Sequence, residues 1–158
     1  MTVRDTSHGG RGPVMVIGGA EDKRGERLVL SRFVEMAGPD PHLVVLSTAS
    51  MRGEEATARY GELFTEMGAA RVTGLRPQTR EEAGDPGGSE ALGTADGVFL
   101  TGGNQVRLVS VIGGTRLEDA LFSARDRGAV IAGTSAGASA VAAHMVAFGG
   151  PGEVPKQR

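Results

Sequence analysis

The sequence predicts an α/β fold: an open, doubly wound and mostly parallel sheet with helices on both faces. Its apolar residues fall in short runs rich in Val, Ile and Leu, which is typical of strands buried on both faces. Amphipathic segments with helical spacing lie between these runs. The expected strands cover residues 13–19, 42–47, 70–75, 97–103 and 129–134. Strand and helix therefore alternate along most of the chain.

The expected helices are recognised by the spacing of their apolar residues. Within residues 53–68, Tyr60 and Phe64 fall on one face of a helix. Gly68 is a residue type that commonly ends a helix. The other expected helices cover residues 24–36, 104–112, 115–127 and 136–147. Each lies between two expected strands or follows the last one.

The chain is expected to consist of a short tail and one domain. Residues 1–12 are polar and predict a flexible tail, and residues 13–158 form the α/β domain. Residues 76–95 contain Gly and Pro, so we expect an exposed loop with one helical turn near residues 89–92. A doubly wound domain rarely stops in a Gly/Pro loop such as residues 148–158. We therefore expect the domain to be incomplete at its C-terminal end.

The composition excludes several classes of function. Hydrophobic residues make up 39% of the 158 residues, which is enough for one core and argues against disorder. The net charge of −2, and an aromatic content of 4% without Trp, do not favour nucleic-acid binding. The absence of cysteine excludes disulfides and thiolate chemistry. No segment resembles a signal peptide or a membrane span, so we expect a cytoplasmic protein without a membrane partner.

Residues 133–137 carry the motif that points to chemistry. They read Gly-Thr-Ser-Ala-Gly, a G-x-S-x-G pattern, between an expected strand and an Ala-rich expected helix. This is the setting of a nucleophile elbow, in which small neighbours let the backbone turn sharply with Ser135 at the apex. The helix start favours a developing oxyanion, and the N–H of Ala136 would be one donor. Ser135 is therefore the candidate nucleophile.

Two other interpretations of residues 133–137 remain open. The segment can be a tight turn from strand to helix in which Ser135 is only a capping residue. It can also be a phosphate-binding loop, because N–H groups at a helix start bind anions. A phosphate site usually has a nearby Lys or Arg, and residues 131–146 contain neither.

Residues 101–105 (Thr-Gly-Gly-Asn-Gln) follow the fourth expected strand at its carboxyl end, where sites form in open α/β sheets. Gly102 and Gly103 allow the backbone to approach a ligand closely, and one of their N–H groups would complete an oxyanion hole. Asn104 or Gln105 would bind a polar substrate. The alternative is a simple turn in which Asn104 caps a helix.

Residues 18–23 (Gly-Gly-Ala-Glu-Asp-Lys) follow the first expected strand and lie at the same edge of the sheet. Glu21 and Asp22 form a pair of acids that would hold a cationic group of a substrate. The alternative is a solvated loop in which Asp22 caps the next helix. Gly18 and Gly19 do not complete a dinucleotide-binding fingerprint, because the third glycine and the helix spacing are missing.

A serine nucleophile needs a base within hydrogen-bond reach, and no residue of the sequence fits that role. His8 lies in the expected tail, and His42 begins a strand at the amino end of the sheet. His144 follows Ser135 on the expected helix, about 13 Å further along the axis. Lys23 is the remaining candidate, with no sign of burial. We expect either a base supplied by residues outside this chain or an inactive chain.

Taken together, these segments resemble the cyanophycinase branch of the cyanophycinase and peptidase E family of serine peptidases. The resemblance rests on GGAEDK (18–23), FLTGGNQ (99–105) and GTSAGAS (133–139), in that order and at family-like separations. The ending GGPGEVPK (149–156) is similar to the segment that follows the nucleophile helix in cyanophycinases. The similarity covers residues 13–156, nearly the whole chain.

The resemblance implies a class I glutamine-amidotransferase-like sheet and the activity of a serine exopeptidase. Ser135 matches the nucleophile, and Gln105 matches a residue near the substrate pocket. Gly103 and Ala136 match the backbone donors of the oxyanion hole. The implied substrate is cyanophycin, a poly-aspartate with arginine on each β-carboxyl, which is hydrolysed to β-Asp-Arg dipeptides through an acyl-enzyme. No metal or organic cofactor is implied, and a homodimer is expected because family members are commonly dimers.

The resemblance also places the catalytic histidine and its acidic partner downstream of residue 158. Glu153 is the only acid after Ser135 and is not expected to belong to a triad. This chain is therefore expected to be inactive alone. The alternatives are a non-catalytic remnant that binds a peptide or a partner, and an Asp-X dipeptidase of the peptidase E type. A sheet cut after its fifth strand exposes an edge, so residues 1–158 alone are expected to be poorly soluble or to oligomerise.

Overall fold

The computed structural model describes residues 10–147, which form a parallel five-stranded sheet with helices on both faces. The predicted α/β fold class is confirmed. The strand order is β1-β5-β4-β2-β3, and every neighbouring pair is parallel. The strands are β1 (Val14–Ile17), β2 (His42–Leu46), β3 (Arg71–Leu75), β4 (Gly97–Leu100) and β5 (Val130–Thr134).

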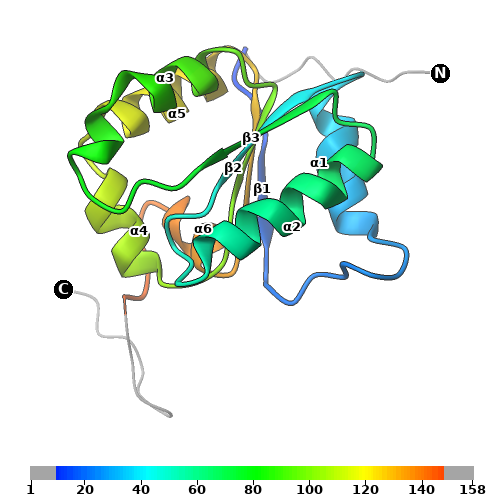
Figure 1. Ribbon diagram of the computed structural model, residues 1–158, viewed down its shortest axis with the longest axis horizontal. Coiled ribbons are helices and arrows are strands. Elements are labelled where there is room, and N and C mark those ends of the chain that lie inside the picture. The colour runs from blue at the N-terminus through cyan, green and yellow to red at the C-terminus, as the bar shows by residue number, and fades with distance from the viewer. Residues whose placement is uncertain (1–9, 148–158) are drawn as a thin grey trace, which may run out of the picture.

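The helices form two layers, one on each side of the sheet (Figure 1). One layer consists of α1 (Leu28–Ala37) and α2 (Gly53–Glu66). The other layer consists of α3 (Pro86–Gly93), α4 (Gln105–Ile112) and α5 (Arg116–Asp126), with the short helix α6 (Ala136–Ala140) after β5. Since β1 leads into α1 and β5 into α6, the chain leaves these neighbouring strands toward opposite faces.

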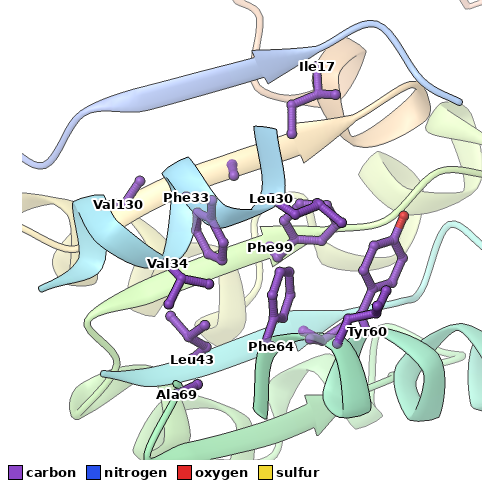
Figure 2. Close-up of a cluster of buried hydrophobic side chains, with 13 residues drawn as sticks. Ile17, Leu30, Phe33, Val34, Leu43, Tyr60, Phe64, Ala69, Phe99 and Val130 are labelled. Carbon is purple, nitrogen blue, oxygen red and sulfur yellow. The ribbon is translucent and has the colours of Figure 1, made fainter. Parts of the chain in front are cut away.

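An aromatic cluster fills the core between the sheet and the α1–α2 layer (Figure 2). Phe33, Phe64 and Phe99 are fully buried, and their ring centroids lie 5.2–5.5 Å apart. Tyr60 packs against Phe99 at 4.7 Å and directs its hydroxyl out of the cluster. Such aromatic pairs each contribute about 0.5–1.5 kcal/mol beyond the area that they bury. The cluster therefore fixes α1 and α2 against β4.

Strand β1 differs from the prediction for residues 13–19. It is shorter, and it is not buried on both faces: Val14 is 39% exposed and Val16 67% exposed. The reason is its place in the sheet. Among the described residues β1 pairs only with β5, so its other side is an open edge. An apolar run alone does not distinguish an edge strand from a central one.

The structure corrects the predictions for two segments, residues 24–36 and residues 76–95. The helix expected from residue 24 begins at Leu28, because the Asp22 side chain accepts hydrogen bonds from backbone N–H groups of the preceding loop. Residues 76–95 hold more structure than one helical turn, namely a 3₁₀ turn over Glu82–Gly84 and helix α3. Pro86 opens α3 at a position where its missing N–H costs no hydrogen bond.

The helix expected over residues 136–147 is also corrected, since α6 ends at Ala140. Residues 141–147 continue without helix, and the Gln105 side chain donates to the carbonyl oxygens of Val146 and Ala147. Helix propensity is a weak preference that such tertiary contacts override. His144 consequently does not lie on a helix, contrary to the prediction, and is exposed.

The register of the sheet brings three motif segments to one edge. Ile17 pairs with Thr134, and Leu100 pairs with Gly133. The residues that follow these strands are therefore neighbours at the carboxyl edge. Residues 18–23, residues 101–105 and Ser135 all lie there, as the sequence predicts.

Candidate functional site

Ser135 lies between β5 and α6 at the apex of a sharp turn, residues 133–137, which we call the Ser135 turn. Its backbone angles are φ 51° and ψ −110°, in a region that residues other than glycine rarely adopt. Such a conformation costs on the order of 1–3 kcal/mol and needs support from its surroundings. The N–H of Ser135 donates to the carbonyl oxygen of Ile17 at 2.9 Å, and the residue is exposed.

The two glycines of the Ser135 turn are required by close packing. A side chain at Gly133 would overlap the backbone of Gly137. A side chain at Gly137 would overlap the backbone carbonyl of Leu100 on the neighbouring strand. Helix α6 thus approaches the sheet so closely that only hydrogen atoms fit. The G-x-S-x-G pattern has a direct structural cause here.

The side chain of Ser135 is flanked by two further glycines from the neighbouring loops. A Cβ atom at Gly19 would lie 3.1 Å from the Cβ of Ser135, and one at Gly102 would lie 3.5 Å from it. Gly19 also has φ 99°, which L-residues rarely adopt. Sequence reasoning tested Gly19 only against a dinucleotide fingerprint and missed this contact. The signal in the sequence that could have indicated this contact was the Gly18-Gly19 pair at the carboxyl edge of the sheet.

The two expected oxyanion donors, Ala136 and Gly103, follow β5 and β4 at the carboxyl edge of the sheet. Ala136 opens α6, and N–H groups in the first turn of a helix have no partner within the helix. Gly103 has φ 144°, and a side chain there would overlap the carbonyl of Ala49. The next residue, Asn104, donates its N–H to that same carbonyl at 2.8 Å. The chain after β4 is therefore held firmly against the loop after β2.

Asn104 and Gln105, the expected polar contacts of a substrate, both make contacts within the protein. Asn104 caps α4, because its Oδ1 accepts from the N–H of Arg107 at 2.9 Å. Gln105 donates from Nε2 to Val146 at 2.9 Å and to Ala147 at 3.2 Å. Gln105 therefore links the start of α4 to the segment that follows α6.

The side chain of Glu21 is buried, and both of its carboxylate oxygens have hydrogen-bond partners. Its side chain is 2% exposed. One oxygen accepts from the hydroxyl of Thr134 at 2.6 Å, and the other accepts from the hydroxyl of Tyr60 and lies 2.7 Å from Nζ of Lys23. Burial raises the pKa of the Glu21 carboxyl, but the bonds from Lys23, Thr134 and Tyr60 outweigh it, so that the pKa is lowered overall.

Asp22, the second acid of the expected pair, is exposed and holds the loop before α1. Its carboxylate accepts from the N–H groups of Gly25 at 2.8 Å, Arg24 at 2.9 Å and Arg27 at 3.1 Å. These backbone bonds lower the pKa of Asp22 to about 2. Asp22 is therefore a permanent surface charge near the site.

The described residues hold no base in contact with Ser135. His8 lies outside them. His42 is buried at the amino end of β2, and neither it nor His144 hydrogen-bonds to Ser135. Lys23 is paired with Glu21 and lies 5.3 Å above the ring of Tyr60.

Neither a metal centre nor a membrane span is found in the described part. Over residues 10–147, no three His, Asp or Glu side chains are grouped so that they could hold a metal ion. No helix in this range is both long and apolar enough to cross a membrane. The segment 149–156, which the sequence comparison with cyanophycinases included, lies outside the described residues, as does Glu153.

Fold and site together define an α/β protein that presents a serine at the carboxyl edge of a parallel sheet, on a turn with strained backbone. The model of peptidase family S51 matches residues 14–155. The chain therefore belongs to peptidase family S51.

Curated relatives of the chain are named cyanophycinases. The cyanophycinase of Nostoc sp. (strain PCC 7120) is 40% identical over 147 residues, which are 91% of this chain and 49% of that protein. The cyanophycinase of Geminocystis herdmanii is 36% identical over 149 residues, which are 93% of this chain and 55% of that protein. The chain thus spans about half the length of the curated relatives it matches.

Solved structures share the fold. A peptidase from an acI-B1 Actinobacterium superposes with a TM-score of 0.73 at 22% identity, covering 87% of this chain and 59% of that one. A putative peptidase E of Listeria monocytogenes superposes with a TM-score of 0.59 at 19% identity, covering 82% of this chain and 61% of that one.

Proposed function

We propose that the chain carries the nucleophile of a cyanophycinase, a serine exopeptidase that hydrolyses cyanophycin to β-Asp-Arg dipeptides. The observation that carries this proposal is the conformation of Ser135, which is exposed at the edge of the sheet with φ 51° and ψ −110°. A strained serine between strand and helix is the geometry that nucleophile elbows use. The identity to proteins named cyanophycinase supports the choice of substrate.

In the proposed mechanism, the Oγ of Ser135 attacks the scissile carbonyl, and the C–N bond breaks as the amine leaves with a proton. Water then hydrolyses the resulting acyl-enzyme and releases the acyl product. The N–H groups of Gly103 and Ala136 receive the negative charge that develops on the carbonyl oxygen. The proton of Ser135 passes to a histidine supplied by residues outside the described range. Asn104 and Gln105 follow β4 at the same edge of the sheet as Ser135, and Asp22 is the exposed acid suited to the guanidinium group of the substrate.

A second candidate function is a non-catalytic protein that binds a peptide. It is favoured by the lack of any described base in hydrogen-bond contact with Ser135. In this case the site would recognise the polymer or a related peptide without cleaving it. An Asp-X dipeptidase of the peptidase E type is a third outcome, with the same nucleophile and another substrate.

Labelling the product of the native gene with a serine-directed fluorophosphonate tests the proposal. The intact mass is measured first, and the label is then located by peptide mapping, with Ser135→Ala as the control. We expect label on Ser135 only, together with release of β-Asp-Arg from cyanophycin. Cleavage of Asp-X dipeptides alone would indicate the dipeptidase.

The negative outcomes are equally informative. A product of about 16.2 kDa that is neither labelled nor active would favour the binding protein. A longer product that leaves Ser135 unlabelled would show that Ser135 is not a nucleophile.

A further inference from the structure

We propose that Glu21 is a positioning residue: its buried carboxylate holds the Ser135 turn in place by accepting the hydrogen bond of Thr134. The inference rests on the proposed function in one respect only: it takes the turn that Glu21 holds to be the catalytic one. It replaces substrate binding, the role expected for Glu21 from the sequence.

The contact between Glu21 and Thr134 lies directly beside the nucleophile. Thr134 is the last residue of β5 and precedes Ser135. Its hydroxyl donates to Oε2 of Glu21 at 2.6 Å, which is short, as is usual for a hydrogen bond to a charged acceptor. Thr134 is 3% exposed, so water cannot readily replace Glu21 as the acceptor. The residue directly before the strained Ser135 therefore has its side chain fixed by a hydrogen bond.

The Glu21 carboxylate is itself anchored to the core. Its second oxygen accepts from the hydroxyl of Tyr60, and Nζ of Lys23 lies 2.7 Å from that oxygen. Tyr60 belongs to α2, and its ring packs in the aromatic cluster against Phe99 while its hydroxyl points out of the cluster (Figure 2). Glu21 thereby connects α2, the loop after β1 and the end of β5.

The same geometry argues against two other roles for Glu21. The Glu21 carboxylate already has three donors and its side chain is only 2% exposed, which leaves little access for a guanidinium group of a substrate. Its pKa is lowered overall, because the three donors outweigh the effect of burial, so Glu21 is a poor acceptor for the proton of Ser135. The role that remains for Glu21 is to support the Ser135 turn electrostatically and sterically.

The loop of residues 18–23 supports Ser135 twice. Gly19 lies against the serine side chain, and Glu21 holds the preceding residue. The strand before this loop accepts the N–H of Ser135 through Ile17. Removing the Glu21 contact should thus loosen the turn without unfolding the sheet, which the other contacts preserve.

The test compares Thr134→Val with Thr134→Ser in the protein from its native gene. Only the serine variant keeps the hydroxyl that donates to Glu21. Glu21→Ala removes the acceptor instead, and Thr115→Val is the matched control. Thr115 is also buried and precedes α5, and its hydroxyl donates to the carbonyl oxygen of Ile112 at the end of α4, in a different part of the fold.

We expect T134V and E21A to lower kcat on cyanophycin and the rate of fluorophosphonate labelling by about tenfold or more, the usual effect of losing a hydrogen bond to a charged group. KM should not change. T134S and T115V should retain the wild-type kcat. The double variant T134V/E21A should be no less active than E21A, because E21A already removes the contact that T134V removes. Equal kcat in T134V and T134S, or a raised KM with unchanged kcat in E21A, would overturn the inference.

Hydrogen exchange separates this inference from the proposed function. The amide of Ser135 donates to Ile17, and that of Ser139 donates to Ser135. Both should exchange faster in T134V and E21A than in T134S and T115V, whether or not the protein is a peptidase. An inactive wild type with this exchange pattern would refute the peptidase and support the role of Glu21. An active wild type, together with equal exchange rates in all four variants, would support the peptidase and refute the role of Glu21.

Discussion

At Ser135, the backbone angles matter as much as the hydroxyl. A serine with positive φ is held there at a cost of roughly 1–3 kcal/mol, so the surrounding contacts must favour this conformation over relaxed ones. Gly19 and Gly102 leave room for the serine side chain on two sides. The backbone then fixes the direction of the Cα–Cβ bond of this exposed serine, and positioning of this kind favours attack by a nucleophile.

Gly19→Ala tests this packing, with Gly18→Ala as the matched control. An alanine at position 19 would place its Cβ 3.1 Å from that of Ser135 and would also be strained at φ 99°. We expect the labelling rate of Ser135 to fall at least about tenfold and the stability to fall by about 1 kcal/mol or more. At Gly18 the space is open, so both quantities should stay near wild type. Equal labelling of the two variants would contradict the packing argument.

The residues found from the sequence and those missed differ in one physical respect. Ser135 and Asn104 follow local patterns, since a G-x-S-x-G turn and a helix cap are each built from neighbours in the chain. The contacts of Gly19 and of Glu21 with the Ser135 turn depend on the pairing of β1 with β5. A single sequence does not reveal which strands are neighbours, so these two roles could not be predicted.

Among the elements, β2 is anchored at its start by a buried histidine. Nδ1 of His42 lies 2.8 Å from the guanidinium of Arg71 and 3.1 Å from the carbonyl oxygen of Thr94. Nε2 of the same ring lies within hydrogen-bond distance of the Thr73 hydroxyl, at 2.9 Å. Burial lowers the pKa of His42 and the charge of Arg71 lowers it further, against the opposing hydrogen bond to Thr94. His42 thus ties β2 to β3.

The stability of the protein should consequently fall as the pH drops below about 6.5, the ordinary pKa of histidine. In this range the unfolded chain binds a proton at His42 more readily than the folded chain does, so protonation favours unfolding. We expect the urea midpoint to fall between pH 7.5 and pH 5.5, and to fall less in His42→Gln. Identical pH dependence in the two proteins would refute this role of His42. The lowered pKa of Glu21 matters only at lower pH, below its usual 4.5.

Element boundaries were less predictable than element types. The helices over residues 53–68, 104–112 and 115–127 are found nearly as expected, because their apolar faces pack on a regular sheet. The helix after Ser135 is shorter than expected, since alanine content indicates propensity but not the contacts that Gln105 makes with residues 146–147. Side-chain contacts over long separations decide where such elements end.

At the scale of the whole molecule, an apolar surface surrounds strand β1. Val16 is 67% exposed on the strand, and Phe122 is 58% exposed on α5. A mostly apolar cavity of about 530 Å³ lies beside the strand, lined by Val14 and Phe122 and bounded by α4, α5 and the end of α6, and its lining does not include Ser135. Exposed apolar edges of this kind favour association.

We therefore expect the 158-residue chain to self-associate through β1, and Val16→Lys to shift it toward monomer. A lysine on an edge strand opposes further strand pairing because its charge would be buried. Met51→Lys is the control, since Met51 is 84% exposed but follows β2, which β4 and β5 separate from β1. Sedimentation velocity measures the outcome. A wild-type chain that remains monomeric over a wide concentration range would contradict the prediction.

The position of β1 also bears on how the protein is made. The first strand pairs only with the last one described, Val14 with Ile131 and Ile17 with Thr134. During synthesis, β2, β3 and β4 can pair with one another before β5 has been made. Until then, β1 has no strand to pair with. Contacts between such distant parts of a chain form slowly, because the intervening loop must first be closed. The Ser135 turn is contacted by Ile17, Gly19 and Glu21, so it can assemble only after β5 has been made and has paired with β1.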